Sequence, residues 1–198
     1  MIKIAFTAPN HMDLEKTPAW QSYLKVKEKY PQHVISRGAN INLVRNKAVS
    51  EKDCFKKFQT DFNFDKILFI DSDIEFTEDD IQSLDLINAP IVAGVYRVTP
   101  DRLSAGVWSG MMGNCSYVTP GTTGIKQVGW ASTGFMMVVK EVFMTMPYPW
   151  FRCFLIETVE EASETSEDIG FCIQAEKYQI KVIANFDVVL KHHKEGLL

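Results

Sequence analysis

Two aspartates separated by one serine, Asp71 and Asp73, follow directly on the apolar run of residues 67–70. A continuous apolar run of this length is typical of a strand that is covered on both faces. Carboxylates with this spacing can place one group on a hard divalent cation and the other on a ribose hydroxyl or a metal-bound water. Aspartates after a strand are also common in turns and helix caps. On the pair alone, both interpretations stay open.

A second acidic pair, Asp79 and Asp80, differs from the first in what precedes it. Thr77 stands at the spacing of a capping box, so this pair falls in the first turn of a helix, where the helix dipole favours carboxylates. We therefore assign Asp79 and Asp80 to helix capping. No such signal precedes Asp71 and Asp73, which come directly after the apolar strand.

A basic residue with its amide neighbour, Arg45 and Asn46, lies on an expected helix over residues 43–58. The guanidinium group of an arginine offers a fork of donors that suits a diphosphate, and the asparagine could orient the adjoining loop. The alternative is that Arg45 lies on a solvated helix face.

A third acidic pair, Glu167 and Asp168, opens another expected helix, and Ser166 is its candidate cap. The macrodipole of the helix stabilises acids at this position, which is the structural interpretation. A carboxylate that projects from a helix N-terminus into a cleft is also a suitable general base for a sugar hydroxyl.

Two histidines, His192 and His193, end the last apolar strand. A neutral imidazole can supply a nitrogen ligand to an ion such as Mn2+. Because neighbouring residues of a strand point to opposite faces, at most one of the two is a ligand, and alternation places His192 on the face of Val188 and Leu190. The alternative is that both are surface residues.

The remaining pattern predicts repeated strand–helix–strand units, which favour an α/β sandwich with a mostly parallel sheet. In such sheets ligands bind beyond the carboxyl ends of the strands, where Asp71, Asp73 and His192 are expected. The expected strands cover residues 2–6, 34–36, 66–70, 90–96, 135–139 and 180–190; the expected helices cover residues 19–30, 43–58, 81–86, 140–144 and 169–178; and residues 99–124 are expected to form a hairpin or an irregular excursion.

Composition and charge favour one soluble domain over residues 1–198. The 21 basic and 25 acidic residues give a formal charge of -4 and form no basic track, so we expect no nucleic-acid partner. The four cysteines form no CxxC pair, which predicts neither a zinc cluster nor a disulfide framework and favours a reducing, cytoplasmic compartment. The apolar N-terminal stretch is too short for a signal peptide or a membrane span, so no membrane insertion is expected.

Taken together, these segments resemble a GT-A fold glycosyltransferase, and the chain is similar to the inverting family 2-like enzymes of bacteria and large viruses. The resemblance covers most of the chain and lies in the order and spacing of its pieces. Those pieces are residues 6–9, 45–49, 67–74, 94–96, 132–137, 166–168 and 191–194.

The resemblance implies a role for each candidate residue. Asp73 would bind the metal, Mn2+ or Mg2+, with His192 as a further ligand, and Asp168 would be the catalytic base. Asp71 would contact the nucleotide ribose. The residues that it assigns to the nucleotide sugar are Thr7, Ala8, Pro9, Arg45, Asp71, Ser72, Gly134 and Glu167.

The implied reaction moves a hexose or deoxyhexose, with inversion, from a nucleotide-diphosphate sugar to a hydroxyl of a glycan or other acceptor. Uridine is the expected base of the donor. A nucleotidyltransferase is an alternative, although residues 7–10 lack the Gly-rich phosphate loop that it would usually want near the first strand. A nucleotide-sugar-binding module without turnover is another. The acidic segment 157–164 is interpreted either as a lid over the donor or as a solvated loop.

Overall fold

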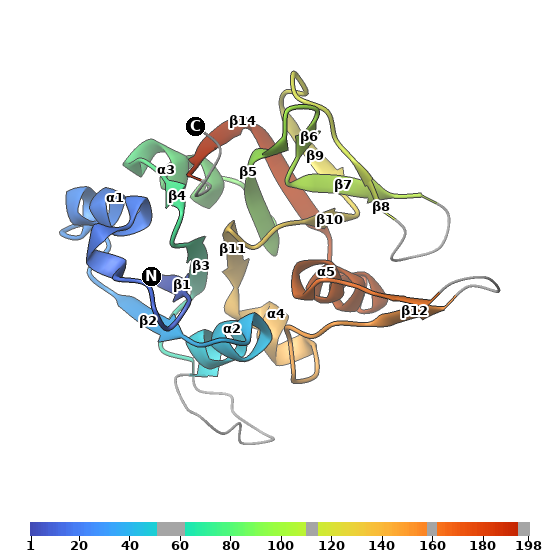
Figure 1. Cartoon of the computed structure of the whole chain (residues 1–198), viewed down its shortest axis with the longest axis horizontal. Helices are drawn as coiled ribbons and strands as arrows, with labels where there is room; N and C mark the ends of the chain where they lie inside the picture. Colours follow the sequence, from blue (N-terminus) through green and yellow to red (C-terminus); the bar gives the residue numbers. More distant parts are fainter. Residues whose placement is uncertain (51–61, 110–114, 158–161, 194–198) are drawn as a thin grey trace.

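The computed structural model of the chain describes residues 1–50, 62–109, 115–157 and 162–193 (Figure 1). Within these residues nine strands form a central sheet with the order β2-β1-β3-β11-β5-β14-β4, to which β6 is added beside β5 and β9 beside β14. The strands of this sheet are β1 (Ile2–Ala8), β2 (His33–Arg37), β3 (Lys66–Asp71), β4 (Ile74–Glu75), β5 (Ile91–Thr99), β6 (Arg102–Leu103), β9 (Ile125–Val128), β11 (Phe135–Val139) and β14 (Val182–His192).

Strand direction confirms the predicted α/β class with a mostly parallel arrangement of the long strands: β2, β1, β3, β5 and β14 run in one direction, and β11, β4, β6 and β9 run against them. β1 pairs in parallel with β2 and β3, and β14 pairs in parallel with β5. β11 lies between β3 and β5 and is antiparallel to both. The reversal brings the start of β11 to the carboxyl end of β3, where the amide of Asp71 donates to the carbonyl of Gly134 at 3.0 Å.

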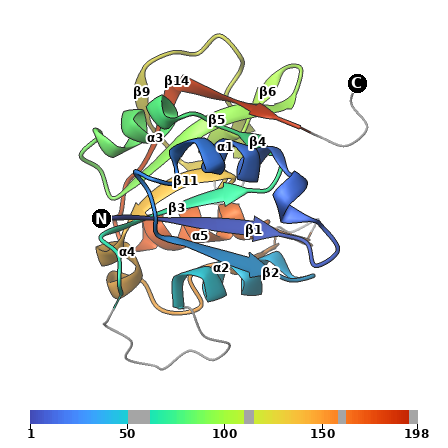
Figure 2. The same ribbon diagram turned by 90° about the vertical axis from the view of Figure 1, so that its left-hand side faces the viewer.

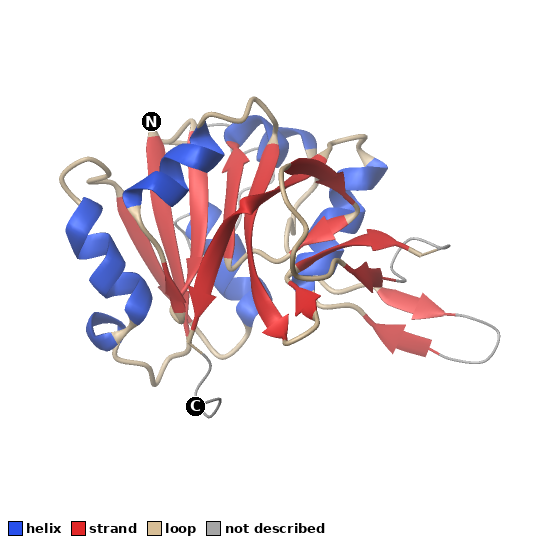
Figure 3. Cartoon of the chain, turned by 90° about the horizontal axis from the view of Figure 1, so that it is seen from above, coloured by secondary structure: helices blue, strands red, loops and turns tan. Residues whose placement is uncertain are grey.

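Helices cover both faces of the sheet, as Figure 2 shows for α1 and α3 on one side of β1 and β3 and for α2 on the other. Figure 3 shows the long strands of the central sheet side by side and shorter strands at one end of the molecule. The helices are α1 (Pro18–Val26), α2 (Ile41–Ser50), α3 (Glu78–Asp85), α4 (Lys140–Thr145), α5 (Glu167–Lys177) and the short 3-10 helix η1 (Leu14–Lys16).

The alternation of β3 explains the two apolar layers. Leu68 and Ile70 are buried in a cluster with residues of α1 and α3. Ile67 and Phe69 are buried in a second cluster with residues of α2, α4 and α5. Because successive side chains of a strand point to opposite faces, one apolar run supports both layers. The continuous run before Asp71 is therefore a central strand, as predicted.

Helix caps fix the start of three helices. Thr77 accepts a hydrogen bond from the amide of Asp80, and the Asp80 carboxylate accepts one from the amide of Thr77 at 2.8 Å, which is the predicted capping box of α3. Ser166 accepts from the amide of Ile169 at the start of α5, and Thr17 caps α1. Asp80 is thus confirmed as a structural residue.

Residues 99–124, expected as a hairpin or an irregular excursion, contain a hairpin, because the consecutive strands β7 (Ala105–Trp108) and β8 (Cys115–Tyr117) pair antiparallel. β7 also pairs with β10 (Trp130–Ala131) in a separate three-stranded sheet within the described residues. Gly106 permits this packing, because a Cβ there would lie 2.5 Å from Nε1 of Trp130 and 2.1 Å from the carbonyl of Ser116.

Other boundaries differ from the predictions by a few residues. α2 begins at Ile41 rather than residue 43, and residues 51–58 of the predicted helix lie outside the described part of the chain. β12 (Leu155–Glu157) and β13 (Ala162–Glu164) form an antiparallel pair within the acidic segment and extend from the rest of the chain in Figure 1. Residues 158–161 of that segment are outside the described residues. None of the helices described is both long and apolar enough to cross a bilayer.

Candidate active site

The carboxyl ends of β1 and β3 bring Thr7 and Asp71 together. The two residues are partners in the parallel register, and the Thr7 hydroxyl donates to Oδ1 of Asp71 at 2.5 Å. The amide of Ser72 donates to the carbonyl of Thr7 at 3.2 Å. Two segments 64 residues apart therefore meet at one edge of the sheet, where the sequence predicts a ligand site.

Arg45 is the centre of this site and is buried, with 2% of its side chain exposed. Its Nη2 donates to both carboxylate oxygens of Asp71, at 3.0 and 3.1 Å, and its Nη1 donates to Glu167 and Asp168. The interpretation of Arg45 as a residue on a solvated helix face is therefore wrong. A guanidinium can hold two carboxylates at fixed positions through paired donors, and here it links β3 to the start of α5.

One guanidinium among three carboxylates leaves this cluster with excess negative charge, and the pKa values follow from that imbalance. Burial and the charge of Asp168 raise the pKa of Glu167 to about 7. Burial also opposes the ionisation of Asp168, but Arg45 and the hydroxyls of Thr133 and Ser132 hold the pKa of Asp168 below its usual value. Burial likewise opposes the charge of Arg45, yet the three carboxylates keep the pKa of Arg45 above its ordinary value. Of the two neighbouring acids, Asp168 is thus ionised more readily than Glu167.

Two hydroxyl groups also donate hydrogen bonds to the Asp168 carboxylate, in addition to Arg45. Ser132 donates to Oδ2 at 2.7 Å and Thr133 donates to Oδ1 at 2.5 Å. The phenol oxygen of Tyr96 lies 2.7 Å from the Ser132 hydroxyl, and burial with the nearby charges of Asp71 and Asp168 raises the pKa of Tyr96 well above its ordinary value. Tyr96 therefore stays protonated and extends a chain of hydrogen bonds to Asp168.

Sequence reasoning did not assign site roles to Ser132, Thr133 and Tyr96. All three lie in segments that carry the resemblance, residues 94–96 and 132–137, but hydroxyl side chains in short loops and strands gave no pattern of their own. The antiparallel direction of β11 is what brings Ser132 and Thr133 to the carboxyl end of β3, and that direction is not visible in the sequence.

Gly134 stands behind the Asp71 carboxylate. A Cβ at this position would lie 2.7 Å from the Tyr96 phenol oxygen and 3.1 Å from Oδ2 of Asp71. A side chain here would displace one of these groups, so glycine is what allows them to approach. The small size of Gly134 therefore lets Tyr96 and Asp71 approach each other, although Gly134 is not among the residues that line the cavity around Asp71.

Asp73 and His192 meet beside this cluster. β4 pairs with the end of β14, and Nε2 of His192 lies 3.0 Å from Oδ2 of Asp73. His193 turns to Glu75, with Nε2 of His193 2.7 Å from Oε2. Of the two histidines, His192 is thus the one beside Asp73.

The fit of a divalent cation to this pair depends on ligands from outside the chain. An oxygen of Asp73 and a nitrogen of His192 converge, which suits Mn2+ and is compatible with Mg2+. No cluster of three or more His, Cys, Asp or Glu able to hold a metal occurs among the described residues. A cation held here would therefore complete its shell with phosphate oxygens or water, as is common where a substrate carries phosphates.

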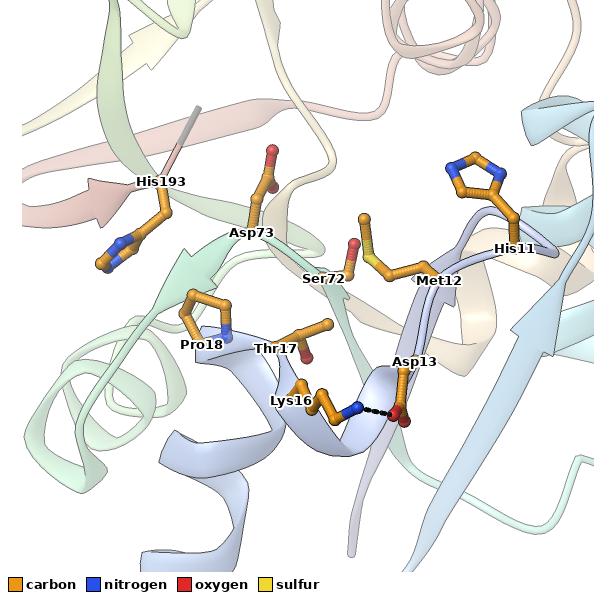
Figure 4. Close-up of a pocket in the computed structure, with 9 residues that line it drawn as sticks. All are labelled: His11, Met12, Asp13, Lys16, Thr17, Pro18, Ser72, Asp73 and His193. Carbon is orange, nitrogen blue, oxygen red and sulfur yellow. Dashed lines mark ion pairs between the residues drawn. The ribbon is translucent and has the colours of Figure 1, made fainter. Parts of the chain in front are cut away.

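Two cavities open on this edge of the sheet. One, of about 690 Å³, is lined by Arg45, Asp71, Glu167 and Asp168 together with the loop after β1. The second, of about 700 Å³, lies on the side of α1 and shares Ser72 and Asp73 with the first. Figure 4 shows the second cavity, in which Nζ of Lys16 forms an ion pair with Oδ2 of Asp13 at 3.1 Å. Of the residues predicted to bind the nucleotide sugar, those that line the first cavity are Thr7, Ala8, Pro9, Arg45, Asp71, Ser72 and Glu167.

Comparison with known proteins gives similarity of structure only. No protein-family model matches the chain. No curated protein matches it in sequence. The chain is similar to the crystal structure of A197 from STIV, with a TM-score of 0.61, 16% identity, and coverage of 98% of this chain and 86% of that chain. At this identity the likeness shows a shared fold alone.

Two weaker structural similarities are to enzymes. One is to glucosyl-3-phosphoglycerate synthase from Mycobacterium tuberculosis, in complex with Mn2+, UDP-glucose and phosphoglyceric acid, with a TM-score of 0.47, 11% identity, and coverage of 100% of this chain and 73% of that chain. The other is to the inositol-1-phosphate CTP transferase from T. maritima, with a TM-score of 0.42, 10% identity, and coverage of 93% and 85%. The structural neighbours thus include a glycosyltransferase and a nucleotidyltransferase.

Proposed function

We propose that this chain is a metal-dependent inverting glycosyltransferase that uses a nucleotide-diphosphate sugar, with uridine as the expected base and a hexose or deoxyhexose as the sugar. The observation that carries the proposal is the bridge formed by Arg45. It joins the carboxylate at the end of β3, Asp71, to the carboxylates at the start of α5, Glu167 and Asp168, inside one cavity.

Donor binding follows from the lining of this cavity. Thr7 and Ala8 at the end of β1, with Pro9 after them, would contact the base and ribose, and Asp71 would accept a hydrogen bond from a ribose hydroxyl. Thr7 and Arg45 hold the Asp71 carboxylate in place before the donor arrives. A site whose acceptors are already oriented loses less entropy when it binds its ligand.

Asp73 and His192 would hold the cation, Mn2+ or Mg2+, at the side of the diphosphate. When bound, the cation supplies charge neutralisation for the departing nucleoside diphosphate. It also offsets the excess negative charge around Arg45, which would otherwise repel an anionic donor. This requirement is a physical reason to expect that donor binding depends on the metal.

Asp168 is the base in this proposal. The acceptor oxygen bonds to the anomeric carbon from the face opposite the diphosphate, the bond from that carbon to the phosphate oxygen breaks, and the hydroxyl proton passes to Asp168. Because the pKa of Asp168 is low, the transfer of the proton comes late, when the attacking hydroxyl has become acidic. Arg45, Ser132 and Thr133 keep the carboxylate oriented during this step.

A thermal-shift screen tests the proposal. Nucleotide sugars and nucleoside triphosphates are added with Mn2+ or Mg2+, because a ligand of the native state raises the melting temperature by mass action. We expect a shift with one nucleotide sugar plus metal and none with metal omitted. Asp73→Asn should lose the metal-dependent shift, whereas Asp79→Asn, in the first turn of α3, should keep it. A shift with triphosphates alone would favour the nucleotidyltransferase interpretation, and no shift with any nucleotide sugar would contradict the proposal.

A further inference from the structure

A third cavity, of about 220 Å³, is also lined by Asp168 but not by Arg45. It shares three residues with the larger cavity, namely Tyr96, Ser132 and Asp168. The remaining walls come from β5, β8, β10, β14 and the start of α5. Ligands in the two cavities would therefore meet at the Asp168 carboxylate and at the hydroxyl chain that orients it.

Tyr117 of β8 forms an aromatic wall of this third cavity. The residue is 39% exposed, while its neighbour Trp130 is buried at 4%. The two rings meet edge to face, with centroids 5.0 Å apart, and the guanidinium of Arg102 lies 5.1 Å from the centroid of the Tyr117 ring. These contacts restrain the ring of Tyr117, so a ligand can pack on it at little cost in side-chain entropy.

The polar groups of the lining are mostly uncharged. Ser104, Ser132 and Ser166 contribute hydroxyl side chains. Among the described lining residues the acid is Asp168, the imidazole is His192, and no lysine or arginine takes part. An anionic ligand in this cavity would lie beside the Asp168 carboxylate without a basic residue of the lining to balance it, which is unfavourable.

We propose that this third cavity binds the acceptor and that the acceptor is an uncharged saccharide. A sugar ring offers an apolar face of C–H groups for Tyr117 and a rim of hydroxyls for the serines, which matches a site with an aromatic wall and a few placed polar groups. The hydroxyl that points to Asp168 is the one that attacks. The inference rests on the proposed function, because it takes Asp168 as the base of that reaction.

Titration of the free protein tests the site without any donor. Methyl glycosides of neutral hexoses are added to the protein with 13C-labelled tyrosines, and the ring signals of Tyr117 are followed by NMR. We expect saturable shifts for a neutral glycoside and weaker or absent shifts for the corresponding sugar phosphate. Unperturbed Tyr117 signals at all glycoside concentrations would overturn the proposal, and so would preferential binding of the phosphate.

A variant series tests the same site during transfer. Tyr117→Ala should raise the KM for the acceptor roughly tenfold and leave the metal-dependent donor shift unchanged, since one aromatic contact is lost. Tyr117→Phe should behave like the unmodified protein, because the ring remains. Tyr178→Ala is the matched control, since Tyr178 is also an exposed tyrosine, at 45%, but caps the far end of α5.

The outcomes separate this inference from the proposed function. If a nucleotide sugar binds with metal and is transferred, but Tyr117→Ala keeps the KM for the acceptor, the acceptor site is wrong and the proposed function stands. If no nucleotide sugar binds while glycosides still shift the Tyr117 signals, the saccharide site stands and the glycosyltransferase proposal fails.

Discussion

Two helices of this protein begin with similar sequences and use them differently. α3 follows Thr77 with three acids, Glu78, Asp79 and Asp80, and α5 follows Ser166 with Glu167 and Asp168. In both helices the hydroxyl residue caps the first turn. The side chain of Glu78 is 41% exposed, whereas those of Glu167 and Asp168 are 12% and 16% exposed and contact Arg45.

The difference shows what separates a structural acid from a candidate catalytic one here. In both helices the local sequence supplies a hydroxyl cap and places acids in the first turn, where the helix dipole stabilises them. What differs is a buried arginine that lies more than 120 residues away from Glu167 and Asp168 in the chain. Variants at the two helix starts and at Arg45 test this contrast.

Removal of the arginine should have the largest effect on stability. Arg45→Met keeps much of the side-chain volume but leaves the buried carboxylates without their cation, which should lower the free energy of unfolding by about 3–5 kcal/mol at neutral pH. Urea denaturation measures this. Arg102→Met, at a surface arginine of β6, should change stability by less than about 0.5 kcal/mol. Equal losses for the two variants would contradict a central role for Arg45.

Because the pKa of Glu167 is raised, this residue should make the free energy of unfolding depend on pH. Its pKa is raised from 4.5 to about 7 in the folded protein, so in this interval the unfolded state releases a proton that the folded state keeps. The stability contributed by Glu167 is therefore complete below about pH 4.5 and is lost as the pH rises through about 7. Glu167→Gln should remove this loss.

Urea denaturation of both proteins between about pH 5 and pH 8 gives the comparison. We expect the stability of the unmodified protein, relative to Glu167→Gln, to fall across this range. Glu176→Gln, an exposed position on the same helix, should follow the unmodified protein at every pH. A constant difference between the unmodified protein and Glu167→Gln would show that the pKa of Glu167 is not raised.

Loss of the caps should give the smallest effects and the most direct contrast. Thr77→Ala and Ser166→Ala should each cost about 1 kcal/mol of stability, because each removes the hydroxyl that accepts from the first turn. Only Ser166→Ala should also reduce transfer, since α5 positions Asp168 and Ser166 lines the third cavity, whereas α3 carries no site residue. A matching loss of transfer in Thr77→Ala would remove the distinction between the two helices.

Strand-end residues were the predictable part of the site. The apolar run before Asp71 and the alternation along residues 180–190 place Asp71, Asp73 and His192 at strand ends, and the structure brings Asp73 and His192 within 3.0 Å of each other. The choice of His192 over His193 as the neighbour of Asp73 became clear only in the structure, because it depends on the pairing of β4 with β14.

Burial of Arg45 could not be predicted, because the periodicity of one helix does not reveal what packs against it. The helix of Arg45 shows polar residues on several sides, and the carboxylates that contact this side chain come from two distant segments of the chain, the end of β3 and the start of α5. The antiparallel insertion of β11 was equally hidden, since it depends on long-range pairing with β3 and β5.

The Asp168→Asn variant separates donor binding from sugar transfer, so it tests whether Asp168 is the base. Asparagine keeps the shape of the side chain and removes its ability to accept a proton. With Mn2+, the cognate nucleotide sugar and a neutral saccharide, Asp168→Asn should bind the donor with an unchanged thermal shift and lose transfer by roughly 10²–10⁴-fold. Asp79→Asn should keep both properties. Undiminished transfer by Asp168→Asn would show that Asp168 is not the base.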